Sequence, residues 1–114
     1  MTNSSFDFVQ LGDFAVYRQC AASSRDEALL DEQLRAAGFV VAAYDLAPAE
    51  QHLYQESAYD ELFVVVSGEI FFYAEGKAEH LFEGDAFCTK ARSYYGYANR
   101  TSQAVRMLVG TKTR

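Results

Sequence analysis

The sequence predicts an all-β protein, a single antiparallel β-barrel with one short N-terminal helix. Short apolar segments recur along most of the chain, glycine-containing turns separate them, and helical periodicity occurs in one stretch only. The chain has 114 residues, of which 50% are hydrophobic and 15% aromatic, enough for one packed core. We therefore expect a single domain over residues 1–114, with N-terminal strands and a helix in 1–38 and the barrel core in 39–110.

Two short strands are expected near the N-terminus, in the stretch FDFVQLGDFAVYRQC. Gly12 and Asp13 form a turn pair between its two apolar halves, as is typical of connected short strands.

One helix of about three turns is expected in the stretch SSRDEALLDEQLRAAG. Ser24 is its predicted N-cap, and Glu27 would close a capping box with it. Asp31 and Arg35 lie four residues apart and should form an ion pair, and Gly38 should end the helix. The residues expected on its buried face are Leu30, Leu34 and Ala37.

The remaining chain is expected to be strands separated by turns. The segment FVVAAYDL is interpreted as a buried strand, and Ala47-Pro48 begins a predicted loop that extends to about Tyr59. The segments ELFVVV and EIFFYAE flank Ser67-Gly68, which suits a two-residue hairpin turn with Gly68 at positive φ.

Further turns are predicted at Gly76-Lys77 and at Glu83-Gly84-Asp85. They separate the expected strands AEHLF, AFCTKA, YYGYA and AVRMLVG. Many short strands at regular spacing are typical of a β-barrel or sandwich, and we expect the barrel.

The charge and cysteine content argue against several classes of partner. A net charge of -6 repels phosphate groups, so we expect neither nucleic acid nor an anionic membrane surface as a partner. No apolar run approaches the roughly 20 residues of a membrane span, and the N-terminus does not resemble a signal peptide. Cys20 and Cys88 lack a metal-binding spacing and are expected to be reduced, which favours a cytoplasmic protein.

A set of residues in the second half of the chain has a specific spacing. Six residues separate Glu61 from Gly68, fifteen separate Gly68 from Gly84, Asp85 follows Gly84, and Asn99 closes the pattern. This spacing resembles that of the cupins, small β-barrels with two sequence motifs, over roughly residues 39–110. The resemblance implies a barrel of the cupin or jelly-roll type. Together with the unpaired edge strands of a short barrel, it also implies a homodimer.

The first motif lacks its usual histidines. Metal-binding cupins hold a divalent metal with three histidines and one glutamate, and the resemblance assigns only the glutamate, Glu61. The two histidine positions of the first motif correspond to Gln55 and Ser57, or to Tyr54 and Glu56 in the other allowed register.

The second motif departs from the family in the same way. Its histidine corresponds to Tyr95, and its proline and glycine correspond to Lys90 and Arg92. Because imidazole is the usual ligand for the relevant metals, the resemblance implies a degenerate cupin with no metal at the usual place and no cofactor.

The two histidines of the chain lie elsewhere. His52 is interpreted as a solvated loop residue; a shifted register would instead make His52, Glu56 and Glu61 a partial metal site. His80 precedes Leu81 on a strand, so His80 should face outward if Leu81 faces the interior.

Glu61 is the main candidate for a functional side chain. The resemblance places it inside the barrel, where poor solvation would raise its pKa and require a hydrogen-bond donor. Tyr95 is the expected donor from across the barrel, and Gln55 or Ser57 the expected donor from the loop. Glu61 and Tyr95 then either serve a ligand or a reaction, or form a buried hydrogen bond that remains from an ancestral metal site.

Three further residues are candidates for ligand binding. Tyr97 shares a strand face with Tyr95, whereas Tyr94 points away, and tyrosine offers both apolar surface and a hydroxyl. Lys90 and Arg92 either meet an anionic ligand at the barrel mouth or are simply solvated.

The sequence thus predicts a cupin-like protein that binds a small molecule without the three-histidine metal site. The alternatives are a metal-free isomerase, cyclase or lyase that uses Glu61 and Tyr95 for proton transfer, and an atypical metalloenzyme that uses His52 and Glu61.

Overall fold

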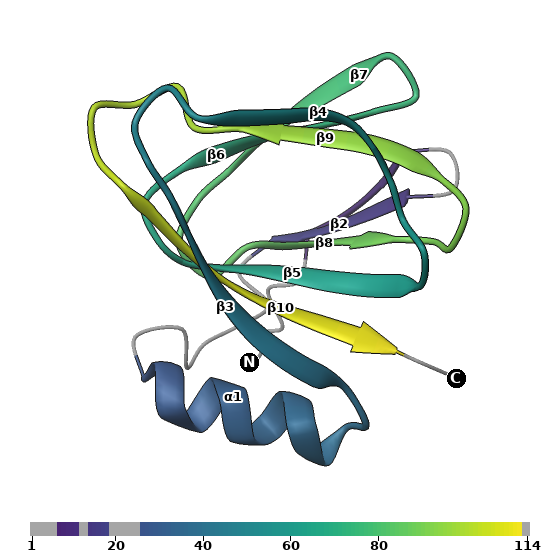
Figure 1. Cartoon of the computed structure of the whole chain (residues 1–114), viewed down its shortest axis with the longest axis vertical. Coiled ribbons are helices and arrows are strands. Elements are labelled where there is room, and N and C mark those ends of the chain that lie inside the picture. Colours follow the sequence, from purple (N-terminus) through teal and green to yellow (C-terminus); the bar gives the residue numbers. More distant parts are fainter. Residues whose placement is uncertain (1–6, 12–13, 19–25, 113–114) are drawn as a thin grey trace.

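The structure is a computed structural model that describes residues 7–11, 14–18 and 26–112. Within these ranges, ten strands form two facing sheets, and one helix lies outside them (Figure 1). The elements are β1 (Asp7–Leu11), β2 (Phe14–Arg18), α1 (Glu27–Ala36), β3 (Val40–Leu46), β4 (Gln51–Glu56), β5 (Asp60–Ser67), β6 (Ile70–Ala74), β7 (Lys77–Leu81), β8 (Ala86–Thr89), β9 (Tyr94–Ala98) and β10 (Val105–Lys112).

All strand pairs are antiparallel, and they divide into two sheets. The six-stranded sheet has the order β1-β2-β8-β5-β10-β3, and the four-stranded sheet has the order β4-β9-β6-β7. The prediction of an antiparallel β-fold with one helix is confirmed. The prediction of a single barrel is not confirmed, because no pairing between the described strands joins the two sheets. The sheets instead pack face to face and bury their apolar surfaces against each other.

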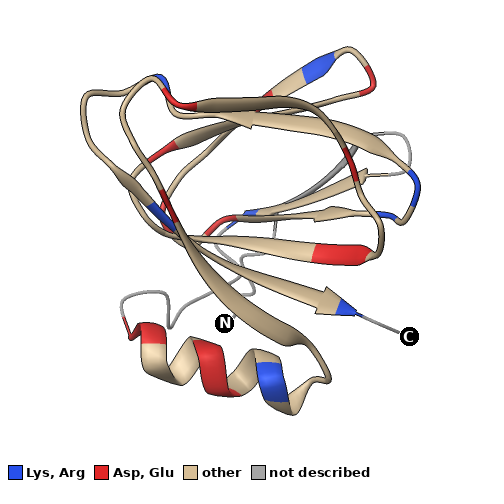
Figure 2. Cartoon of the chain, in the orientation of Figure 1, with Lys and Arg blue, Asp and Glu red and all other residues tan. Residues whose placement is uncertain are grey.

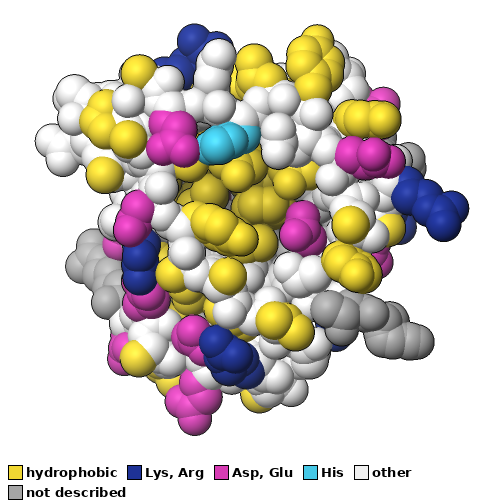
Figure 3. Space-filling model, in the orientation of Figure 1, with side chains coloured by type: hydrophobic (Ala, Val, Ile, Leu, Met, Phe, Trp, Pro, Cys, Tyr) yellow, Lys and Arg dark blue, Asp and Glu magenta, His cyan; other side chains and the backbone are white. Residues whose placement is uncertain are grey.

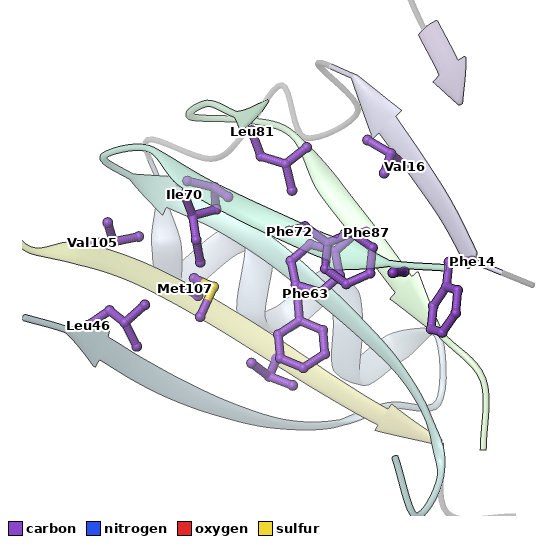
Figure 4. Close-up of a cluster of buried hydrophobic side chains, with 13 residues drawn as sticks. Phe14, Val16, Leu46, Phe63, Ile70, Phe72, Leu81, Phe87, Val105 and Met107 are labelled. Carbon is purple, nitrogen blue, oxygen red and sulfur yellow. The ribbon is translucent and has the colours of Figure 1, made fainter. Parts of the chain in front are cut away.

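The main core lies between the two sheets (Figure 4). Successive residues of a strand point to opposite faces, so Phe63 and Val65 of β5 enter this core whereas Val64 and Val66 point the other way. The largest fully buried side chains in it include Phe14, Ile70, Phe72, Leu81, Phe87 and Met107. The position of Leu81 confirms that His80, the preceding residue, points to the outside of its sheet.

A second, smaller core lies between the large sheet and helix α1. Val64 and Val66 pack there with two helix residues, Leu30 and Leu34. Figure 1 shows the helix along the outer side of β3 and β10. The predicted buried face is confirmed for these two leucines, but Ala37 is exposed because the helix ends before it.

The helix begins two residues later than the predicted capping box requires. Its N-cap is Asp26, whose side chain accepts a hydrogen bond from the N–H of Leu29 at 3.1 Å. Ser24, the predicted cap, lies outside the described residues. Serine and aspartate are equally good N-caps, so the local sequence does not choose between them. Glu27 instead pairs with Arg106 of β10 at 2.7 Å.

The end of the helix agrees with the sequence. Arg35 forms the predicted ion pair with Asp31. Gly38 has φ of +96°, and its N–H donates to the carbonyl of Arg35 at 3.0 Å. Glycine adopts this left-handed conformation without steric cost, so Gly38 ends the helix as predicted.

Two predictions on the first half of the barrel region were wrong. The strand FVVAAYDL is β3, but it lies at the edge of its sheet, and only Val41 and Leu46 of it are buried. The predicted loop after Ala47-Pro48 contains strand β4, which pairs with β9. β4 is a polar, exposed edge strand, so it lacks the alternation of apolar residues that marks a half-buried strand.

The turn at Ser67-Gly68 is not a hairpin. β5 belongs to the six-stranded sheet and β6 to the four-stranded sheet, so this turn carries the chain from one sheet to the other. Gly68 has the predicted positive φ, +91°, because the chain turns sharply there. A two-residue hairpin does occur at the next turn, but at Glu75-Gly76 rather than at the predicted Gly76-Lys77, because Lys77 is already the first residue of β7 and pairs with Ala74.

The two N-terminal strands agree with their prediction. β1 pairs with β2 from Asp7 opposite Arg18 to Leu11 opposite Phe14. The turn residues Gly12 and Asp13 lie outside the described residues.

Candidate functional site

Glu61 lies on the inner face of the large sheet. It alternates with the core residue Phe63 along β5, so its side chain points toward the opposite sheet. Its neighbours in the sheet are Thr89 of β8 and Thr111 of β10. The hydroxyl of Thr111 donates a long hydrogen bond to Glu61 Oε2 at 3.4 Å.

Two tyrosines face Glu61 from the opposite sheet. Tyr95 and Tyr97 of β9 pack against the main core, whereas Tyr94 is 61% exposed on the other face. The ring centroids of Tyr95 and Tyr97 each lie 5.7 Å from that of Phe63 and 6.2 Å from one another. These three rings form an aromatic wall next to the carboxyl group of Glu61.

Ser57 joins the two sides of this site. It is 2% exposed, its N–H donates to the carbonyl of Ser93 at 2.9 Å, and its carbonyl accepts from the N–H of Arg92 at 2.6 Å. The hydroxyl of Ser57 donates to that of Thr89 at 2.8 Å. The same hydroxyl is near enough to Glu61 and to Tyr95 to lower the pKa of each.

Burial controls the ionisation of the site. Desolvation raises the pKa of Glu61, and hydrogen bonds from Thr111 and Ser57 offset only part of this rise. Desolvation, and then the negative charge of Glu61, raise the pKa of Tyr95 well above its ordinary range. Desolvation also raises the pKa of Tyr97. Both tyrosines therefore remain protonated donors, and no cation in the described part of the chain forms an ion pair with Glu61.

Glu61→Gln is expected to stabilise the protein at neutral pH and to have little effect in acid. Because the folded-state pKa of Glu61 is raised, ionising this carboxyl costs more free energy in the folded chain than in the unfolded chain. The cost is absent below the unfolded-state pKa of about 4.3, where both states are protonated, and it grows as the pH rises through the folded-state pKa. The Tm of Glu61→Gln minus that of the wild type, measured by circular dichroism, should therefore increase with pH.

Glu56→Gln is the matched control, because it removes one negative charge from an exposed position. A Tm difference for Glu61→Gln that stays constant across the pH range would contradict the desolvation of Glu61.

The space between the sheets is open on one side. Viewed as in Figure 1, the molecule is hollowed there, with hydrophobic side chains at the bottom and histidine and acidic side chains at the edge (Figure 3). Tyr44 of β3 lies opposite the core residue Met107 in the register, so it too is on the inner face. We call this feature the central hollow: the space bordered by Glu61, Phe63, Tyr95, Tyr97 and Tyr44.

His52 lies at the edge of the central hollow rather than in a loop. It is part of β4 and pairs with Tyr97, and the two ring centroids are 5.4 Å apart. Its Nε2 lies 2.7 Å from Glu50 Oε2. Glu56 pairs with Tyr94 on the opposite face of the sheet, so the predicted alternative set of His52, Glu56 and Glu61 is not brought together. No group of three or more metal-ligating side chains occurs among the described residues.

The other predicted ligand-binding residues are exposed. Gln55 pairs with Tyr95 in the sheet, but its side-chain amide donates to the carbonyl of Leu53 rather than to Glu61. Lys90 and Arg92 are exposed in the loop between β8 and β9, where Figure 2 shows basic residues close to the acidic start of β5.

Arg92→Gly is expected to raise the free energy of unfolding by about 0.5–1 kcal/mol. Arg92 has φ of +69°, the left-handed conformation that a glycine adopts without steric cost. The gain is limited because glycine also increases the conformational entropy of the unfolded chain. Urea denaturation measures the change. Lys90→Gly, at an exposed position of the same loop without positive φ, is the control and should not stabilise the protein.

No pattern in the sequence indicates that Thr111, Thr89 and Glu50 are neighbours of the candidate residues. The threonines are next to Glu61 only through strand pairing, which has no local signal in the sequence. Glu50 precedes β4 and lies two residues before His52, with which it pairs.

Solved structures with the same fold include several cupins. A Cupin 2 conserved barrel domain protein from Salinispora arenicola CNS-205 is 16% identical with a TM-score of 0.61, and the match covers 66% of this chain and 63% of that one. The Cupin_2 domain of an XRE family transcriptional regulator from Enterobacter cloacae is 21% identical with a TM-score of 0.57, covering 70% and 86%. ToxT from Vibrio cholerae strain SCE256, solved with an unsaturated fatty acid bound, is 12% identical with a TM-score of 0.58, covering 67% and 30%.

At these identities the similarity concerns the fold alone. No curated protein matches the chain significantly. No helix in the described part of the chain is long and apolar enough to span a membrane. The sequence model of the cupin domain matches residues 43–110, which is more than half of the chain. The chain therefore belongs to the cupin domain family.

Proposed function

We propose that this cupin binds a small molecule in the central hollow, with Glu61 and the tyrosines of β9 as its contacts. The observation that carries the proposal is the half-buried carboxyl of Glu61, which faces an aromatic wall and has no cationic partner among the described residues. A carboxyl group in such surroundings is costly for folding, so its presence favours a role with a ligand.

The chemistry of the central hollow favours an uncharged or cationic ligand with an apolar body. Phe63, Tyr95 and Tyr97 offer aromatic surface, and the two hydroxyls offer hydrogen bonds. Glu61 would accept a hydrogen bond from the ligand or pair with an ammonium group. Glu50 at the edge and the net charge of -6 disfavour an anion in this place.

The ligand is proposed to bind without the three-histidine metal site of the metal-binding cupins. Of the four residues that such a site requires, the chain retains only Glu61 at the corresponding position. Ser57 and Tyr95, at two of the other positions, are near enough to hydrogen-bond with each other. Hydroxyl groups are poor ligands for the metals that imidazole binds, so these residues suit direct contact with an organic ligand.

A screen with small uncharged and cationic compounds, followed by ligand-observed NMR, tests the proposal. Binders of the central hollow should lose about tenfold or more in affinity on Glu61→Gln or Tyr95→Phe, because each change removes one hydrogen-bonding group. The matched controls Glu56→Gln and Tyr94→Phe lie on the outer face of the four-stranded sheet and should keep the wild-type affinity. If neither Glu61→Gln nor Tyr95→Phe changes the affinity of any binder, the proposed site is wrong.

A second candidate function is a metal-free isomerase, cyclase or lyase. The raised pKa of Glu61 favours it, because a carboxyl that titrates closer to neutrality is a more effective general base or acid. Tyr95 would then act as the proton donor through its neutral hydroxyl. Conversion separates the two functions: an enzyme converts a compound that binds in the central hollow and loses this conversion on Glu61→Gln even at saturating compound, whereas a binding protein converts none of its ligands.

We also propose a homodimer. Strand β3 forms one edge of the large sheet, and two of its large apolar side chains, Val40 and Tyr44, are 58% and 50% exposed. An unprotected apolar edge strand favours pairing with a second copy. Light scattering at micromolar concentration should give about twice the chain mass of 12.8 kDa. A mass of one chain would contradict the proposal.

A further inference from the structure

A second pocket lies on the outer face of the four-stranded sheet, away from the central hollow. Its volume is about 550 Å³, which is within the range of small-molecule sites. Its lining residues come mainly from β4, β9, β7 and the β6–β7 turn, and Figure 1 shows that this turn extends beyond β4. We call it the outer pocket. The side chains that line it include those of Leu53, Tyr54, Tyr73, Lys77, Tyr94 and Arg100.

A bulge in β4 forms one wall of the outer pocket. The register between β4 and β9 shifts between His52 and Gln55, and Tyr54, inside the bulge, has φ of +58°. The bulge turns apolar side chains outward, so that Tyr54 is 87% exposed and Leu53 is 40% exposed. Gly96 of β9 allows this approach, because a Cβ atom there would lie 3.1 Å from Leu53 Cα. A strained backbone with exposed aromatic residues is more typical of a binding site than of a stabilising feature.

A cation is held in place on the other side of the outer pocket. Arg100 Nε donates to the hydroxyl of Tyr73 at 2.7 Å. The guanidinium carbon lies 5.7 Å from the ring centroid of Tyr73 and 5.9 Å from that of Phe71. This stacking fixes the plane of the guanidinium group and leaves its terminal nitrogens for a planar anion.

The charge of the outer pocket differs from that of the chain as a whole. Lys77 and Arg100 both line it, and neither forms an ion pair with a carboxylate in the described part of the chain. Glu75 is the one acidic residue among those that line it. The pocket therefore has a positive balance in a chain of net charge -6, which favours an anionic group there.

We propose that the outer pocket binds a flat aromatic molecule that carries one carboxylate. The ring would lie between Tyr94 and the bulge residues Leu53 and Tyr54, and the carboxylate would accept hydrogen bonds from Arg100, with Lys77 adding charge. Tyr95 lines this pocket as well as the central hollow. The side chain of Tyr94 nevertheless lies on the opposite face of the sheet from those of Tyr95 and Tyr97, so the groups proposed to contact the ligand here differ from those proposed in the central hollow.

Titration of the full chain with 2-naphthoate, followed by naphthalene fluorescence and saturation-transfer NMR, tests the proposal. We expect saturable binding that weakens about tenfold on Arg100→Gln and several-fold on Lys77→Gln or Tyr94→Ala. The uncharged analogue 2-naphthamide should bind about tenfold more weakly than 2-naphthoate. Lys90→Gln, which removes an exposed cation outside the pocket, is the matched charge control and should leave the affinity unchanged.

The same titration distinguishes the other possible occupants. Equal affinity for the two naphthalene compounds, no effect of Arg100→Gln, or no saturable binding at millimolar concentration would overturn the proposal. A loss of 2-naphthoate binding on Glu61→Gln would overturn it by placing the compound in the central hollow. If Tyr94→Ala converts a dimer of the wild type into a monomer, the outer pocket is covered by a second copy, and the proposal is also wrong.

Discussion

Phe72→Ala is expected to lower the free energy of unfolding by about 3–5 kcal/mol, because it truncates a large aromatic side chain in the main core. Phe72 is fully buried at the contact between the two sheets. Its ring centroid lies 3.8 Å from that of Phe87 and 5.9 Å from that of Phe14, in stacked and edge-on arrangements. Alanine would remove the aromatic contacts and leave a cavity that strands held in two sheets cannot close.

Urea denaturation followed by far-ultraviolet circular dichroism measures this effect. Phe82→Ala is the control, because Phe82 is 45% exposed and its truncation opens no cavity in the core. Since small domains have only about 5–15 kcal/mol of stability, Phe72→Ala should be close to unfolding at physiological temperature. A loss below about 1 kcal/mol would mean that the two sheets are not held together by this core.

Asn99→Ala is expected to lower the free energy of unfolding by roughly 2–4 kcal/mol. Asn99 is 1% exposed, and its side-chain amide donates to the carbonyls of Leu46, Ala47 and Gln103 at 3.2, 3.2 and 2.7 Å. Its side-chain oxygen accepts from the N–H of Thr101 at 2.9 Å. The residue thus connects the end of β3 to the loop between β9 and β10, and alanine would remove these hydrogen bonds and leave a small cavity at a buried position.

Asn99→Asp gives a sharper version of this test. The carboxylate would place a negative charge against the carbonyl oxygens of Leu46, Ala47 and Gln103, so it should destabilise the protein at least as much as alanine at neutral pH. Gln103→Ala, which removes an exposed side chain from the same loop and keeps its carbonyl, should have little effect. If Asn99→Asp keeps wild-type stability, the amide does not contribute through these bonds.

The spacing of the two motifs was sufficient to predict which residues face the candidate site. The register between Glu61 and Gly68, and between Gly84 and Asn99, assigned Glu61 and Tyr95 to positions that face each other across the core. The structure brings both to the central hollow because the number of residues between them, and hence the alternation of inner and outer faces, is preserved. The same register places Arg92 where a glycine is usual, and Arg92 has the positive φ that such a position requires.

The sequence did not show what surrounds Glu61. Ser57 is near the carboxyl of Glu61, and Thr111 hydrogen-bonds to this carboxyl from a strand fifty residues further along the chain. His52 lies at the edge of the central hollow only because β4, a polar edge strand, pairs with β9. These neighbours depend on which strands pair, and strand pairing is a non-local property that no local pattern reports.

By itself, the sequence determined the local elements of this protein: most of the strands, the body and end of the helix, and the turns at Gly68, Gly76 and Gly84. These follow from the period of apolar residues and from the steric freedom of glycine, both of which act within a few residues. Only the tertiary structure decided that the strands form two sheets, that Ser67-Gly68 crosses between them, and that β3 and β4 are edge strands. The physical reason is that sheet partners are chosen by burial of apolar surface and by backbone hydrogen bonds between distant segments.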